Sequence, residues 1–334
     1  MRVGIIGAGA VGGAIAALLS RGGHDVEVTA RGAQLKAIRE NGISLDGEWG
    51  AHVAQVGAAR LLTLTPDLVI VTTKAHDTAG ALAANAEFTT GVPVLVVQNG
   101  LAGLETAAAA APKSRVIGGL AMYAASFLKP GRVTITGTGV TYLGGPSDSA
   151  LGLAADVLGA VMPVEIVKNF AGAQWSKLVV NQINALPALT GLSAQEVIAD
   201  RGLRRLMTAS IRETVRVGIA NGITFEDLHG LTDSKLRFMA RMPLAAGEIL
   251  PRQFARRMGS VPNPGSTQQS IRRGKPSEID FLNGAVVAAA ATAGVEAPVN
   301  AALVQLVHEV ELSYVFMSPA EVVRRVDQLT RAAA

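Results

Sequence analysis

The sequence predicts an α/β domain built on a parallel sheet over residues 1–169, followed by an all-α domain over residues 170–334. Three observations predict this organisation. The chain has 334 residues, which is too many for one ordinary hydrophobic core. Short apolar segments alternate with helical segments in the first half, as they do in βαβ units. From about Phe170 the strand pattern stops and helical periodicity continues alone.

Strands are expected at seven apolar segments of the first half. A further pair, Ile43–Leu45 and His52–Gln55, flanks an Asp-Gly turn and is expected to form a small hairpin. The seven segments are Arg2–Ile6, Val26–Thr29, Leu68–Thr72, Val94–Val97, Val116–Gly118, Arg132–Ile135 and Val140–Leu143.

The second half is expected to consist of helices joined by one irregular stretch. Residues 243–277 contain five prolines and several glycines, so this stretch is predicted to lack regular structure. The expected helices are Phe170–Leu189, Leu203–Asn221, Ile279–Ala293, Ala301–Leu312 and Pro319–Ala332.

Composition excludes several kinds of site. The chain has no cysteine, which excludes disulfides, thiolate nucleophiles and Cys-ligated metals and is compatible with the cytoplasm. The five histidines are scattered and form no helical pair, so no metal site is expected. Residues Val3 to Ser20 carry no charge, but five glycines make them a poor membrane helix, and no membrane association is expected.

Basic residues concentrate between Lys235 and Lys275, in a chain whose net charge is +4. A solvated helical face explains this segment most simply, and a positive approach for an anionic cofactor and substrate is the alternative. A nucleic-acid partner would need a basic face with interleaved aromatics, and none is expected. The sequence leaves the oligomeric state open, a homodimer included.

A G-x-G-x-x-G motif lies between the first expected strand and a helical run, which is the context of a Rossmann dinucleotide site. The first glycine permits the tight turn, the second lets the backbone approach the pyrophosphate, and the third lets the helix pack on the strand. The helix N-terminus then offers free N–H groups to the phosphates. The expected cofactor-binding residues here are Gly7, Ala8, Gly9, Ala10, Val11 and Gly12.

The end of the second strand indicates which dinucleotide binds. NAD sites usually have a carboxylate there for the ribose 2′-hydroxyl. This strand ends at Thr29 without an acid, and Arg31 stands where a 2′-phosphate would lie. A guanidinium binds phosphate through paired charged hydrogen bonds, so NADP(H) is expected. The alternative is that Arg31 is an ordinary surface arginine.

Polar residues also end the next two strands, with Lys74 after one and Asn99 after the other. Ligands of open α/β sheets bind at these carboxyl ends. Residues of this kind are also common turn formers, which leaves both interpretations open.

One helix of the second half carries an unusual polar stripe. Lys177, Asn181 and Asn184 fall on one face of an otherwise apolar segment, and asparagine is a poor helix former. Buried polar groups need partners, so the stripe is a candidate site, although an ordinary polar helix face is the alternative. Further on, Ser277 is expected to cap a helix that begins at Glu278, and a first-turn acid favoured by the helix dipole is the simple explanation of Glu278.

Six segments together resemble the ketopantoate reductases, and the resemblance covers nearly the whole chain. They are GAGAVGG at 7–13, VTTKAHDT at 71–78, QNG at 98–100, GG at 118–119, WSKLVVN at 175–181 and PSEIDFLNG at 276–284. The resemblance implies a Rossmann domain, a helical domain like that of 6-phosphogluconate dehydrogenase, and substrate in the cleft between them, with Asn99 facing Lys177.

By motif match, the resemblance also assigns roles. Lys177 is implied as the proton donor, and Glu278 as a catalytic residue near the nicotinamide ribose that also contacts the cofactor. Cofactor contacts are implied for Lys74, Asn99 and Ala125. Substrate contacts are implied for Asn99, Lys177, Asn181, Asn184, Asn263 and Ser266.

The substrate side departs from the family pattern. Asn184 follows the lysine by seven residues rather than eight, and a further family asparagine has no match in residues 191–195. The stretch from Asn221 to Asn263 is longer than in compact members. The expected function is NADPH-dependent reduction of a 2-oxo acid, foremost 2-dehydropantoate. The alternatives are a related hydroxy acid or opine dehydrogenase, an NADPH-binding sensor without turnover, and, least favoured, a nucleic-acid binder.

Overall fold

The computed structural model describes residues 1–258 and 262–332 and divides into two compact units, Met1–Phe170 and Ala171–Ala334. The first unit combines two sheets with helices, and the second is helical among its described residues. The α/β and all-α classes predicted from the sequence are confirmed.

The main sheet of the first unit has eight strands. Adjacent strands run parallel, except that β11 lies antiparallel to β8. In spatial order they are β12 (Val164–Ile166), β11 (Thr141–Gly144), β8 (Val116–Ala121), β7 (Val94–Val97), β6 (Leu68–Val71), β1 (Arg2–Ile6), β2 (Asp25–Thr29) and β5 (Gly57–Ala59).

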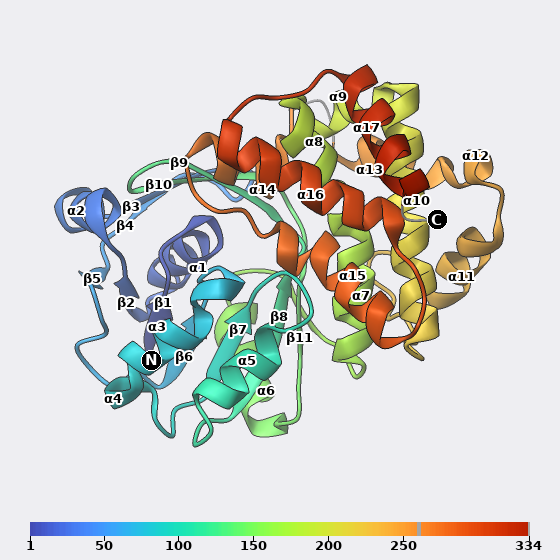
Figure 1. Cartoon of the computed structure of the whole chain (residues 1–334). Helices are drawn as coiled ribbons and strands as arrows, with labels where there is room; N and C mark the ends of the chain where they lie inside the picture. Colours follow the sequence, from blue (N-terminus) through green and yellow to red (C-terminus); the bar gives the residue numbers. More distant parts are fainter. Residues whose placement is uncertain (259–261, 333–334) are drawn as a thin grey trace. The chain divides into compact units, whose positions relative to one another are not determined.

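Side chains of the central strands alternate between two buried clusters, one on each face of the main sheet. Ile5 and Ile70 belong to the cluster shared with α1 (Ala10–Arg21) and α6 (Asp148–Gly159). Their neighbours Ile6 and Val71 belong to the cluster shared with α3 (Thr78–Ala84) and α5 (Gly103–Ala110), two helices that lie side by side (Figure 1). Burial on both faces explains why these strands are continuous apolar runs.

A second sheet of four strands packs against α1. The predicted hairpin is confirmed as its antiparallel pair β3 and β4, and the predicted strand Arg132–Ile135 lies here, outside the parallel sheet. Gly13 of α1 permits the approach, since a Cβ there would lie 2.8 Å from Val133 Cγ2. In spatial order the strands are β4 (His52–Ala54), β3 (Ile43–Gly47), β10 (Arg132–Gly137) and β9 (Ala124–Lys129).

Three strands have no counterpart in the sequence prediction: β5, β9 and β12. β5 consists of Gly-Ala-Ala and β12 has only three residues, so neither carries a strong strand signal. Both lie at edges of the main sheet, where pairing with one neighbour determines the conformation. The remaining short elements of this unit are α2 (Gly32–Asn41), η1 (Ala75–Asp77) and α4 (Ala86–Thr89).

The second unit is organised around the 20-residue helix α10 (Arg201–Ala220). This helix contacts most of the other helices of the unit. The other helices of the unit are α7 (Phe170–Asn181), α8 (Ala185–Thr190), α9 (Ala194–Ala199), α11 (Asp233–Arg241), α12 (Leu244–Gly247), α13 (Ile249–Met258), α14 (Gly265–Arg272), η2 (Ile279–Phe281), α15 (Asn283–Thr292), α16 (Pro298–Ser313) and α17 (Pro319–Ala332).

The prediction that residues 243–277 are irregular is wrong, because α12, α13 and α14 lie within them. The prolines stand where helices tolerate them. Pro243 and Pro264 are the N-cap residues of α12 and α14, and Pro251 lies in the first turn of α13. The N–H that proline lacks has no intrahelical partner in the first turn of a helix.

Two predicted helices are interrupted. The segment Phe170–Leu189 breaks after Asn181, where Gln182, Ile183 and Asn184 each donate a backbone hydrogen bond to the residue three positions earlier. The segment Ile279–Ala293 breaks at Leu282 into η2 and α15. Among the described residues, no helix is both long and apolar enough to cross a membrane.

Candidate active site

The glycine loop of residues 7–12 follows β1 and leads into α1. Gly7 has a φ of 108°, a left-handed conformation that favours glycine. A Cβ on Gly12 would overlap the carbonyl oxygen of Gly7 and the hydroxyl of Thr72. A Cβ on Gly9 would meet no atom within 4 Å, and no side chain caps the start of α1. The loop therefore leaves open space in front of uncapped backbone N–H groups, which fits a dinucleotide pyrophosphate.

Three side chains that the sequence prediction missed hold this loop. Thr29 Oγ1 accepts a hydrogen bond from Gly7 N (3.1 Å), and Thr72 Oγ1 donates to Gly7 O (2.6 Å). Gln34 Nε2 donates to Ala8 O (2.8 Å), while Gln34 Oε1 accepts from Gly131 N (2.7 Å). A hydroxyl at the tip of both β2 and β6 is the only sequence signal that points to such a role for the threonines.

Arg31 is exposed and is the N-cap residue of α2, the helix that follows β2. Strand β2 pairs with β1, the strand that leads into the glycine loop. Its side chain makes no cap hydrogen bond, and the first turn of α2 has no acid. Both acids of β2 are occupied elsewhere. Asp25 pairs with Arg2 (2.9 Å) at the opposite end of the strand, and Glu27 accepts hydrogen bonds from Thr63 N and Oγ1.

Lys74 and Asn99 follow β6 and β7, which are adjacent in the main sheet. Both side chains are half-buried, and Lys74 is the N-cap residue of η1. Gln98 joins the two strand ends, since its Nε2 donates to Thr73 O (2.7 Å) and Thr78 Oγ1 (2.6 Å). Apart from Ala125 and Glu278, the residues predicted to contact the cofactor thus lie at the carboxyl ends of the neighbouring strands β7, β6, β1 and β2.

Ala125 lies elsewhere in the first unit. It belongs to β9 of the second sheet, opposite Ile135 of β10, and is half-buried. Its cofactor contact stays a prediction, because the structure gives Ala125 no feature of its own that binds a ligand.

Lys177 is buried in α7, with 8% of its surface exposed. Burial lowers the pKa of Lys177 from its ordinary value to about 8, and the negative charge of Glu278 opposes part of that fall. A lysine with a pKa near neutrality is suited to donating a proton at physiological pH.

The asparagines near Lys177 differ in their partners. Asn181 lies one turn after Lys177, is 8% exposed, and its Nδ2 has no hydrogen-bond partner among the described residues. Asn184 lies in the break after α7 and has a partner at each end of its amide: Oδ1 accepts from Ser266 N (3.2 Å), and Nδ2 donates to Asn181 O (3.1 Å). The predicted single helical face for Lys177, Asn181 and Asn184 is wrong, but Asn184 connects Asn181 with Ser266.

Asn263 belongs to the turn before α14, three residues from Ser266. Its Oδ1 accepts from Gly265 N (2.9 Å), its N donates to Gln195 Oε1 (3.0 Å), and its O accepts from Ala194 N (2.8 Å). These contacts fix the loop that presents Ser266. In this structure the Asn263 side chain therefore serves the loop itself.

Side chains of α16 bind the residues on either side of Glu278 in the sequence. Glu311 Oε1 accepts from Ser277 N (2.7 Å), and His308 lies between Glu311 Oε2 (2.8 Å) and Asp280 Oδ1 (2.9 Å). Burial alone would lower the pKa of His308, but its bonds to the two carboxylates outweigh burial and raise it. Ser277 Oγ accepts from Ile279 N (3.2 Å), but the prediction that it caps a helix beginning at Glu278 is wrong, because only the 3₁₀ turn η2 follows and Glu278 is its N-cap residue.

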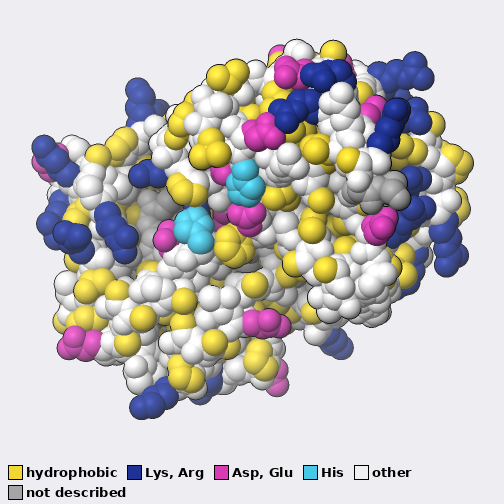
Figure 2. Space-filling view, viewed as in Figure 1, with side chains coloured by type: hydrophobic (Ala, Val, Ile, Leu, Met, Phe, Trp, Pro, Cys, Tyr) yellow, Lys and Arg dark blue, Asp and Glu magenta, His cyan; other side chains and the backbone are white. Residues whose placement is uncertain are grey.

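The basic residues between Lys235 and Lys275 are distributed over several helices. Many bind groups nearby: Arg237 pairs with Asp233, Arg252 with Glu248, and Lys235 donates to Gly230 O. On the visible face of the helical unit, basic side chains have acidic and apolar ones between them (Figure 2). A solvated helical surface explains this segment; the side chain of Arg257 lies outside the described residues.

Comparison with known proteins shows the family of this chain. The model of the family "Ketopantoate reductase PanE/ApbA" matches residues 3–148, and that of its C-terminal domain matches residues 169–311. A 2-dehydropantoate 2-reductase of Archaeoglobus fulgidus is 32% identical over 315 residues, 93% of this chain and 98% of the relative. A solved ketopantoate reductase from Ralstonia eutropha JMP134 is 29% identical, with a TM-score of 0.80 over 94% of this chain and 99% of that one.

A more distant structure shares the fold. D-mandelate dehydrogenase, solved with NADH and anilino(oxo)acetate, is 22% identical, with a TM-score of 0.79 over 94% of this chain and 99% of that one. Fold, glycine loop and relatives together define an NAD(P)-dependent oxidoreductase that acts on CH–OH donors. The chain belongs to the ketopantoate reductase family, whose members reduce 2-oxo acids.

Proposed function

We propose that this protein reduces 2-dehydropantoate to pantoate with NADPH and that Lys177 donates the proton. The observation that carries the proposal is the buried Lys177, with its lowered pKa, one helical turn from the unpartnered amide of Asn181. The names of the relatives support the substrate. When bound, NADPH supplies the hydride that the ketone carbon receives.

Lys177 acts on the ketone oxygen of the substrate. Negative charge develops on that oxygen during reduction, and an ammonium group stabilises it and then gives it a proton. A pKa of about 8 leaves most of the lysine charged at neutral pH while making the proton easier to release. Glu278 contributes the opposing negative charge that keeps the ammonium form populated.

Neutral groups orient the substrate. The unpartnered Nδ2 of Asn181 is a buried donor, and a substrate oxygen would satisfy it. Ser266 is half-buried at the start of α14, where its hydroxyl can bind the substrate carboxylate. Asn184 and Asn263 fix the backbone that presents these groups, and we assign them this supporting part of substrate binding. On the sheet side, Lys74 and Asn99 would hold the cofactor, with Asn99 also reaching the substrate.

NADPH is favoured over NADH by the surroundings of β2. A ribose 2′-hydroxyl needs a free carboxylate at the strand end, and both carboxylates of β2 are bound to other groups. Arg31 stands there instead, exposed and making no cap bond. An arginine in this place suits a 2′-phosphate.

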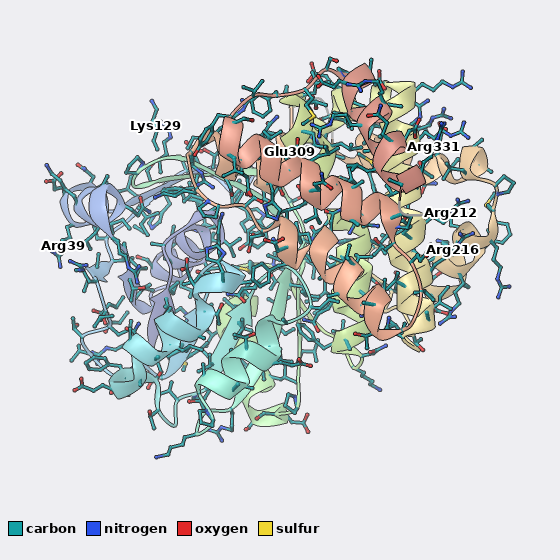
Figure 3. All side chains as sticks on the ribbon, in the orientation of Figure 1. Arg39, Lys129, Arg212, Arg216, Glu309 and Arg331 are labelled. Atoms are coloured by element: carbon teal, nitrogen blue, oxygen red, sulfur yellow. The ribbon has the colours of Figure 1, made fainter. Side chains whose placement is uncertain are left out.

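Arg31→Ala is expected to weaken NADPH binding by about 1.5–3 kcal/mol, the usual contribution of hydrogen bonds to a charged group. NADH binding should stay almost unchanged, since NADH has no 2′-phosphate. Titration of protein fluorescence with each cofactor measures both affinities, and Arg39→Ala, further along α2, is the control (Figure 3). Equal affinity of the native protein for the two cofactors would contradict this assignment.

The substrate is tested by NADPH oxidation with 2-dehydropantoate, 2-oxoisovalerate, pyruvate and phenylglyoxylate. We expect the highest kcat/KM with 2-dehydropantoate. A clear preference for phenylglyoxylate would instead identify a hydroxy acid dehydrogenase. Tight NADPH binding without oxidation by any 2-oxo acid would identify a sensor.

A further inference from the structure

Four fully buried polar side chains meet in the core of the helical unit. Gln182 follows α7, Ser210 lies in α10, Asn283 begins α15, and Asn300 lies in the first turn of α16. Each has 0% of its surface exposed. We call these four residues the amide cluster. Burying amides and a hydroxyl costs free energy unless they bind one another, so such a cluster needs a reason.

Hydrogen bonds join all four members. Asn283 Nδ2 donates to Gln182 Oε1 (2.7 Å) and to Asn300 Oδ1 (2.9 Å). The Ser210 hydroxyl lies 2.8 Å from Gln182 Oε1 and 2.9 Å from Asn300 Oδ1. Gln182 Nε2 also donates to Leu178 O in α7 (3.0 Å). The bond between Gln182 and Asn283 therefore connects the end of α7 directly with the start of α15.

These two ends carry the proposed catalytic groups. Gln182 is the residue after Asn181, and it binds the carbonyl of the residue after Lys177. Asn283 lies five residues after Glu278, and only η2 and Leu282 separate them. The cluster thus links the Lys177 helix to the Glu278 segment through two short connections.

The other half of the cluster is anchored by a carboxylate. Glu213 of α10 accepts hydrogen bonds from Val299 N (2.9 Å), Asn300 N (2.9 Å) and Asn300 Nδ2 (2.7 Å). Arg212 and Arg216 lie on the side of α10 toward α11, where Arg216 donates to Ala240 O (Figure 3). One side of α10 therefore holds the N-terminus of α16 and the cluster, while another holds α11.

Apolar side chains of similar size would fill this space without any desolvation cost. Hydrogen bonds differ from apolar packing because they have direction and fix both the rotation and the axial position of the helices that they join. Catalytic groups must be held within about 0.5 Å of their productive geometry. A polar cluster beside such groups can thus provide position rather than stability.

We propose that Gln182 and Asn283 are positioning residues for the reduction, holding the Lys177 helix and the Glu278 segment in one fixed register. This inference rests on the proposed function. Neither residue contacts the reacting atoms; each acts through the segment it belongs to.

The kinetic test compares two asparagines that bind at α15. Asn283 joins α15 to the amide cluster, and Asn221 joins α15 to the end of α10. Asn283→Ala removes the cluster's central donor. Asn221→Ala, the control, removes a bond from the end of α10 to Ala289 O (3.1 Å), at the other end of α15. We expect Asn283→Ala to lower kcat by about tenfold or more, since a misplacement of about 1 Å can cost about 10²-fold. KM and NADPH affinity should change less than about threefold, and Asn221→Ala should keep native kcat.

Gln182→Met, which is nearly isosteric, repeats the test if Asn283→Ala does not fold. Rates are compared at a temperature at which circular dichroism shows every variant folded. Native kcat in a folded Gln182→Met or Asn283→Ala protein would show that the cluster only stabilises the fold. An equal loss in Asn221→Ala would show that any loosening of α15 suffices, and would also overturn the proposal.

A second readout needs no substrate. Reductive ¹³C-methylation followed by NMR titration gives the pKa of Lys177, identified by its absence in Lys177→Met. Loss of the cluster should let water reach the ammonium, so this pKa should rise from about 8 toward 10.5, with no rise in Asn221→Ala. If the protein reduces no 2-oxo acid but the pKa of Lys177 still rises in the variants, the proposed function is refuted. The role of the cluster in fixing the Lys177 helix against the Glu278 segment then stands. An unchanged pKa of Lys177 in Gln182→Met would refute the positioning role of the cluster.

Discussion

Lys177→Met should lower turnover by about 10²–10⁴-fold, the usual contribution of general acid catalysis, while NADPH binding is largely retained. Methionine keeps much of the lysine's length and suits the buried site of α7, so the fold should persist. What the substitution removes is the positive charge and the proton. Stopped-flow measurement of NADPH oxidation with saturating substrate gives the rate, and thermal unfolding checks the fold.

The pH dependence gives the same assignment in the native protein. The ammonium form donates the proton, so kcat/KM for reduction should be level below pH 8 and fall about tenfold per pH unit above the pKa of Lys177. Bound cofactor phosphates would raise this pKa, so the descent should begin at pH 8 or higher. Lys235→Met, on the exposed surface of α11, is the matched control and should behave as native. Near-native turnover of Lys177→Met would make the lysine structural.

Two glycine substitutions in the same loop should affect different properties: Gly9→Ala the affinity for NADPH, and Gly12→Ala the stability of the fold. Gly9→Ala should change the free energy of unfolding by less than about 1 kcal/mol, because the added methyl meets no atom within 4 Å and the φ of −82° suits alanine. NADPH affinity should fall by about 100-fold or more, because the methyl would displace the pyrophosphate from several N–H groups, each contributing about 1.5–3 kcal/mol.

Gly12→Ala should instead damage the fold. Its methyl would overlap the Gly7 carbonyl and the Thr72 hydroxyl, and backbone cannot move aside as a flexible side chain can. We expect a loss of about 1–3 kcal/mol or more in unfolding free energy, as for other overpacked cores. Urea unfolding and isothermal titration with NADPH separate the two variants. A Gly9→Ala protein that binds NADPH normally would show that the space before Gly9 serves some other purpose.

Local sequence signals predicted the parts of the site that depend on local geometry. The glycine loop has strict backbone requirements within six residues, so the motif indicated both its place and the role of each glycine. The three apolar residues between Lys177 and Asn181 similarly suggested partial burial of Lys177, which the structure shows to be buried. Strands β1 and β7 were predictable to the residue because both faces of the sheet are buried, which makes their sequences apolar apart from Arg2 at the start of β1.

Long-range hydrogen bonds account for much of what the sequence did not predict. The bond from Ser266 N to Asn184 spans 82 residues, and it holds Asn184 in a turn that helical periodicity cannot foresee. Gln34 reaches Gly131 over 97 residues. Gln182 looked like one more polar residue of a helix, although its partner Asn283 lies 101 residues away. Helical or strand periodicity describes a single element, whereas the position of each of these side chains depends on a hydrogen bond between two elements.

The N-cap of α2 imposes a compromise between stability and cofactor choice. Helices start best with Ser, Thr, Asp or Asn, but Arg31 occupies this position and makes no cap bond. An aspartate there would both cap α2, gaining about 0.5–2 kcal/mol, and supply the carboxylate that a ribose 2′-hydroxyl requires. The stability of α2 alone would therefore favour an aspartate at this position, and an aspartate would favour NADH. If Arg31 selects NADPH, α2 binds the phosphorylated cofactor at the expense of the stability that a capping side chain would give it.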